Sequence, residues 1–168
     1  MCLPAAGQNA WSEADCVTLL DSTSVTVQPN GSGSFAVYKS FKVHTPKGAV
    51  NNHVIKYDYD PLTAFARFKQ VTVQRANGET MQVDVTKICD YAAPARAIYW
   101  GARQIMLELG RLEPGDVVSY EISKKGFTYA LLAGAEDDDA RFIPPMRGQF
   151  YDIVPFWVNE PTRRKIYV

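Results

Sequence analysis

Hydrophobic and polar residues alternate along most of this chain, and this period of two restricts the possible folds more than any other feature. In the segment 34–43, Phe35, Val37, Phe41 and Val43 fall on one face of an extended chain. Ser34, Ser40 and Lys42 fall on the other face, which is typical of a half-buried strand. Further strands are predicted over 16–20, 24–28, 53–59, 65–75, 80–85, 103–109, 117–123, 149–157 and 163–168.

Turn residues separate these strands. Asn77-Gly78 lies between two alternating segments and predicts a hairpin, and Pro114-Gly115-Asp116 predicts another turn. About nine or ten short strands, with turns every 8–12 residues or so, are typical of an all-β, two-sheet β-sandwich with mostly antiparallel strands. The segments 86–101 and 133–147 have no clean period and are expected to be irregular, the first as a long loop or a short helix.

Length and charge narrow the class of protein. The chain has 168 residues, with 18 Lys+Arg against 18 Asp+Glu, and this balance argues against a general nucleic-acid binder. No apolar stretch approaches the roughly 20 residues of a membrane span. We expect one domain over 12–168 that needs no cofactor. The preceding residues 1–11 are expected to be a flexible leader, either the remnant of a signal peptide or a polar tail.

The chain has three cysteines, Cys2, Cys16 and Cys89. No two of them form a CxxC motif, which argues against a zinc or thioredoxin-like site. Cys16 and Cys89 lie in apolar, strand-like segments and are expected to pack as small hydrophobes. A bridge between these two cysteines, or a reactive thiol, is the alternative.

Candidate catalytic groups are sparse. His44 and His53 both lie at expected strand ends, where a histidine is usually solvated. Asp58 and Asp60 share a strand face, as a pair of glycosidase carboxylates could, and Cys89 is the candidate nucleophile. An enzyme built on Cys89 or on the aspartate pair is therefore one hypothesis, although we predict no catalytic residue in this chain.

Two binding sites are also candidates. The acidic loop that contains Asp137, Asp138 and Asp139 could hold one weak calcium ion, but it lacks the spacing of an EF-hand loop and is expected to be solvated. No other metal site is expected.

Aromatic side chains are concentrated near the irregular segments. They either cap the core or form an exposed platform that stacks on a sugar ring or contacts a neighbouring domain. The residues of this candidate binding surface are Tyr99, Trp100, Phe156 and Trp157. A carbohydrate-binding β-sandwich module is the function that this platform would suggest.

Several short motifs occur in a characteristic order. They are Thr45-Pro46-Lys47-Gly48-Ala49, Ile55-Lys56-Tyr57-Asp58, Asn77-Gly78-Glu79, the segment LEPGDVVSYE at 112–121, and Gly148-Gln149-Phe150-Tyr151-Asp152-Ile153. This order resembles the domain of unknown function that precedes a transglutaminase-like domain in secreted or periplasmic bacterial proteins. The resemblance extends from about residue 13 to 168, and its most specific part is the segment 112–121.

The resemblance implies a β-sandwich without catalytic residues of its own, in a periplasmic or extracellular protein. In such proteins the Cys-His-Asp triad lies in the following transglutaminase-like domain, which is similar to a papain-type cysteine hydrolase and is often labelled a protease. Neither Cys16 nor Cys89 falls in a motif of that domain. The preferred hypothesis is thus an accessory domain that contacts the downstream transglutaminase-like domain of the same polypeptide, with protein, peptide or glycan as a further partner. The strand that remains open at Val168 suggests that the chain was truncated before that domain.

Overall fold

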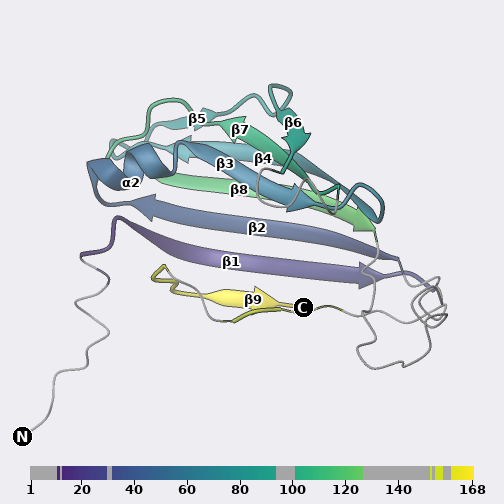
Figure 1. Cartoon of the computed structure of the whole chain (residues 1–168). Helices are drawn as coiled ribbons and strands as arrows, with labels where there is room; N and C mark the ends of the chain where they lie inside the picture. The colour runs from purple at the N-terminus through teal and green to yellow at the C-terminus, as the bar shows by residue number, and fades with distance from the viewer. Residues whose placement is uncertain are drawn as a thin grey trace, which may run out of the picture.

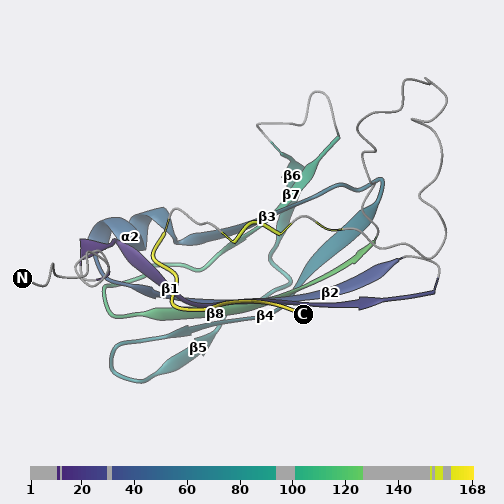
Figure 2. The same ribbon diagram turned by 90° about the horizontal axis from the view of Figure 1, so that it is seen from below.

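Strands in two facing layers dominate the computed structural model, which describes residues 11, 13–29, 32–93, 101–126, 152, 154–156 and 160–168 (Figures 1 and 2). The large sheet has six strands in the order β5-β4-β8-β2-β1-β9, and the small sheet has three in the order β3-β7-β6. The predicted all-β, two-sheet sandwich is therefore confirmed. The strands are β1 (Cys16–Val27), β2 (Gly33–Val43), β3 (Val54–Tyr59), β4 (Ala64–Gln74), β5 (Thr80–Gln82), β6 (Cys89–Ala92), β7 (Arg103–Glu108), β8 (Val117–Gly126) and β9 (Lys165–Tyr167).

The first strand is longer than the alternation predicts. Two short strands were expected over 16–20 and 24–28, but β1 is continuous, because Ser22 and Thr23 keep pairing with β2. A register shift between Thr18 and Leu20 marks a bulge in this pairing, which adds a residue to one strand without ending the ladder.

The short helix α2 (Pro46–Asn51) occupies a segment that the alternation indicates only as a break. Thr45 explains why a helix begins there, since its Oγ1 accepts a hydrogen bond from the Gly48 N–H at 3.0 Å and proline follows in the first turn. The same hydroxyl donates to Asp15 Oδ1 at 2.6 Å. A Cβ on Gly48 would lie 2.2 Å from the Asp15 carbonyl oxygen, so glycine allows α2 to pack closely against the chain that enters β1.

Two segments differ from the sequence-based expectation. Strand β6 lies within 86–101, where a loop or a short helix was expected, and it pairs antiparallel with β7 from Cys89 opposite Met106. The strand expected over 149–157 falls mostly outside the described residues, and residues 152 and 154–156 are not in a strand. No helix in the described ranges is both long and apolar enough to span a membrane.

The apolar core lies between the two sheets. Fully buried aliphatic side chains from both sheets meet there, and each contributes about 1.5–3 kcal/mol by leaving water. Residues that are at most 1% exposed include Val43, Val71, Val73, Ile105, Leu107, Val118 and Ile122. We call this cluster the apolar interlayer.

A second region on the inner face of the large sheet, the face that is turned towards the small sheet, is polar. Asp21 lies opposite Lys39 in the β1–β2 register and pairs with Lys165 of β9, with 3.6 Å between Lys165 Nζ and Asp21 Oδ2. Tyr167 donates a hydrogen bond of 2.7 Å to Asp152 Oδ2. We call this half-buried set the polar interlayer; its members are Asp21, Lys39, Tyr57, Tyr120, Lys124, Asp152, Lys165 and Tyr167.

Candidate functional site: a cleft beside an open strand edge

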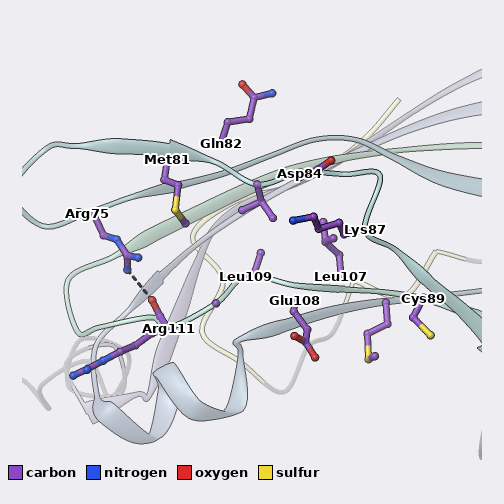
Figure 3. A pocket seen from close by; sticks show the side chains of 13 residues that line it. Arg75, Met81, Gln82, Asp84, Lys87, Cys89, Leu107, Glu108, Leu109 and Arg111 are labelled. Carbon is purple, nitrogen blue, oxygen red and sulfur yellow. Dashed lines mark hydrogen bonds between the residues drawn. The ribbon is translucent and has the colours of Figure 1, made fainter.

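A cleft of about 550 Å³ lies at one side of the sandwich, a volume within the usual range of ligand pockets. Met81, Gln82 and Val83 line it from the large sheet and the chain that leaves it. Glu108 and Leu109 line it from β7 and the loop that follows, and Figure 3 shows them across the cleft from Met81 and Gln82. We call this hollow the edge cleft.

The edge cleft contains an unpaired stretch of strand β7. Antiparallel ladders direct the backbone groups of successive residues alternately to the two neighbouring strands. The Leu109 N–H donates to the His53 carbonyl on the β3 side at 2.8 Å, so the N–H and C=O of Glu108 face the opposite side. Strand β6 would have to reach residue 87 to meet them, but its pairing ends at Cys89 opposite Met106.

The loop after β7 forms one end of the edge cleft and is held by an ion pair between a half-buried arginine and a buried carboxylate. Arg75 Nη1 donates to the Arg111 carbonyl at 2.9 Å and to Asp116 Oδ2 at 2.6 Å. Asp116 is 1% exposed, and its Oδ2 also accepts the Glu113 N–H at 2.8 Å. Removing one partner of such a pair would leave a buried charge, which costs several kcal/mol. The LEPGD motif is therefore a rigid structural element, and Arg75 is a residue that the sequence pattern did not single out.

Gly115 completes the explanation of this motif. Its φ is +98°, in the region that favours glycine, and a Cβ there would lie 2.9 Å from the Ala76 Cβ. The loop therefore packs directly against the β4–β5 hairpin. This contact joins the two walls of the edge cleft, the β5 side and the loop after β7.

The two described cysteines have different surroundings. Cys16 is 5% exposed in the core, as predicted, and burial raises the pKa of its thiol to about 11, so it is protonated at neutral pH. Cys89 is exposed and lines the edge cleft, so its expected burial is wrong. It lies in a short strand at the margin of the small sheet, where few side chains cover it. Both thiols are free, so the alternative of a bridge between them is also wrong.

The other predicted catalytic candidates have local structural roles. Asp58 Oδ1 accepts a hydrogen bond from Gln104 Nε2 on the neighbouring strand at 2.5 Å. Asp60 lies beyond the end of β3, where its Oδ1 accepts the Leu62 N–H at 2.9 Å and closes a turn. His53 is exposed, and its Nδ1 contacts the Val50 carbonyl oxygen. These contacts stabilise turns and strand pairs.

Most of the predicted binding residues cannot be placed. Tyr99, Trp100 and Trp157 lie outside the described residues, as do the candidate calcium ligands Asp137, Asp138 and Asp139. Phe156 is described and is 62% exposed, with Lys165 Nζ 5.9 Å from its ring centroid. Within the part of the chain that the structure describes, no group of three or more His, Cys, Asp or Glu side chains could hold a metal ion.

The fold and the cleft define a β-sandwich domain with an open strand edge. Residues 29–168 match a domain of unknown function with a solved structure, DUF3857, and the chain belongs to this family. Comparison with curated protein sequences finds no match.

Several solved structures are similar to this chain, among them the following two. One, from Parabacteroides distasonis, is described as a "putative protease"; it has a TM-score of 0.56 and 16% identity over 68% of this chain. The chain spans only 24% of that protein's length. The other is a CBM3a-L domain with flanking linkers, from a scaffoldin of the Clostridium thermocellum cellulosome, with a TM-score of 0.40 and 10% identity over 68% of this chain and 69% of that one. The first similarity supports the fold.

Proposed function

We propose that this chain is a non-catalytic accessory domain of a longer secreted or periplasmic protein. In this proposal it packs against a transglutaminase-like domain of the papain type and helps to position a protein or peptide substrate. One observation carries the proposal: the same fold occurs as about a quarter of a longer chain that is described as a "putative protease". The resemblance of the segment 112–121 to domains that precede transglutaminase-like domains supports it further.

The chemistry of the described thiols supports a binding role. A cysteine nucleophile requires a lowered pKa and a base within hydrogen-bond reach. Burial raises the pKa of Cys16 instead. Among the described residues that line the edge cleft with Cys89, none is a histidine.

Exposed apolar side chains support an interface with another domain. Val50 on α2 is 68% exposed beside a hollow of about 850 Å³ between the helix and the 110–114 loop. Phe156 is 62% exposed in the C-terminal segment. Interfaces between domains bury roughly 600–1,500 Å², and aromatic residues are enriched in them.

A binding experiment in trans tests this proposal. The coding sequence around these 168 codons is read in both directions, and any transglutaminase-like domain that it encodes is purified separately. The expected result is a complex with this chain that is weakened by Val50→Glu or Phe156→Ala. Met81→Glu, in the edge cleft, serves as the matched control. An open reading frame without such a domain, or purified domains that do not associate, would contradict the proposal.

A further inference from the structure

We propose that the edge cleft binds an extended peptide by β-strand addition to β7. The peptide would run antiparallel to β7, in line with β6, and its main chain would pair with the N–H and C=O of Glu108. This inference rests on the proposed function in one respect, that the ligand is a polypeptide. The unpaired backbone of Glu108 and the partly exposed side chain of Met81 carry it.

The backbone of β7 provides the pairing groups. Met106 has a register partner on both sides, in β3 and in β6, whereas Glu108 has one only in β3 and its own N–H and C=O face away from that strand. Among the described residues, no backbone hydrogen bond joins Glu108 to the chain at 83–88, and the Lys87 N–H donates to Asp84 instead. The Glu108 groups therefore remain available to an added strand, the arrangement in which main-chain bonds supply affinity.

The large sheet provides an apolar contact for the same peptide. Met81 lies opposite Val73, which is fully buried, so both side chains point towards the core side of the sheet. Met81 is nevertheless 38% exposed, and it lines the edge cleft with half-buried Val83. A flexible thioether adapts to ligands of different shape. An apolar side chain that points inwards from the added strand would cover Met81 and Val83.

The outward face of the same peptide would be polar. Successive side chains of a strand point to opposite faces, so the neighbours of the inward residue would lie beside Glu108 and Lys87. Both side chains are exposed, and no ion pair involves either of them in the described ranges. The ligand that fits is therefore an extended segment that alternates apolar and polar residues, with a bulky apolar residue facing inwards.

Direct binding of synthetic peptides to the purified chain tests this inference. The probe is an array of blocked decapeptides that alternate Val, Leu or Met with Thr, Lys or Glu. We expect a subset to bind and to slow hydrogen exchange at the Glu108 amide. Glu108→Pro should weaken binding about tenfold, because it removes the donor to the peptide. Proline is tolerated at an outward-facing edge position. Glu108→Gln keeps the N–H and is the matched control, so it should bind these peptides more tightly than Glu108→Pro does.

A second variant keeps the test decisive if Glu108→Pro fails to fold. Met81→Glu should also weaken binding about tenfold, since it places a charge against the inward apolar residue. Val50→Glu changes another exposed apolar residue, outside the edge cleft, and should have no effect. Three results would each overturn the inference. They are peptide binding that is unchanged in Met81→Glu, binding of no peptide at all, and a second copy of the chain occupying the edge. Association with a transglutaminase-like domain would be unaffected by these outcomes and tests the proposed function separately.

Discussion

The apolar interlayer and the polar interlayer both pack on the inner face of the large sheet, yet different forces hold them. In the first, Ile105 and Leu107 of the small sheet pack with Ile122 of the large sheet, all of them almost completely buried. In the second, half-buried charges and tyrosines bridge β1 and β9 to Asp152. Packing density therefore determines the stability of one region, and hydrogen bonds to charged groups determine that of the other.

The electrostatic surroundings confirm this difference. Burial raises the pKa of Tyr120 above its usual range, and the negative charge of Asp21 adds to the effect. Burial also lowers the pKa of Lys124. The pKa of Tyr167 rises to about 12 through burial and the hydrogen bond to Asp152. Partly desolvated polar groups are therefore a property of this region, which attaches the C-terminal segment to the sandwich.

The largest effect is expected from a cavity in the apolar interlayer. Ile122 is fully buried, and Ile122→Ala should lower the free energy of unfolding by about 2–5 kcal/mol, because the cavity adds to the lost transfer energy. Chemical denaturation of the two proteins measures the change. A loss below about 1 kcal/mol would show that this region is loosely packed, and would contradict the view that dense packing stabilises the apolar interlayer.

A smaller effect is expected in the polar interlayer. Tyr167→Phe removes the hydroxyl that donates to Asp152 and should cost about 1–2 kcal/mol, since hydrogen bonds to charged groups are stronger than neutral ones. Tyr38→Phe is the matched control, because Tyr38 is 39% exposed on the outer face of the large sheet and should change stability little. Equal effects of the two substitutions in thermal unfolding would remove the special role of the polar interlayer.

The pH dependence of the free energy of unfolding tests the burial of Cys16. Cys16 belongs to the same buried hydrophobic cluster as the apolar interlayer, and its pKa is raised to about 11, above the ordinary value of 9.0. The folded state then holds the thiol proton more tightly than the unfolded state, so this contribution is complete below pH 9 and is lost as the pH rises towards 11. Cys16→Ala should flatten this decrease in the free energy of unfolding. An unchanged slope would contradict the assigned burial.

Thiol labelling tests the burial of the cysteines and is expected to change the stability of the protein least. In a Cys2→Ser background, a maleimide should modify exposed Cys89 in the native protein at pH 7.5 or so, whereas Cys16 should react only after unfolding. Mass spectrometry of the labelled peptides distinguishes the two sites. Rapid native labelling of Cys16 would show that the core opens readily.

Sequence alternation predicts the longer strands of both sheets but not the short strand β6. Phe35, Phe41 and Val43 are buried on the predicted face of β2, because a period of two is sufficient to assign a half-buried strand. Strand β6 was missed because its four residues are exposed or half-buried and show no alternation. Helix α2 was missed because its start depends on the Thr45 cap, a tertiary contact with Asp15, and only one turn and a half follows.

The candidate site could not be predicted from the pattern. Its central feature is the unpaired backbone of Glu108, which depends on where β6 ends relative to β7. The motif at 112–116 did indicate the loop beside it, but the Arg75–Asp116 pair that holds this loop joins residues 41 positions apart. Strand register and long-range ion pairs are tertiary properties, which a single sequence does not encode as a local signal.

The most direct test of the account is an activity assay on the purified 168-residue chain. Fluorogenic peptide libraries and amine-acceptor substrates are incubated with the wild type and with Cys89→Ala. We predict no turnover by either protein, with peptides bound but neither cleaved nor cross-linked. Hydrolysis or cross-linking by the wild type that Cys89→Ala abolishes would contradict it and would identify the edge cleft as an active site.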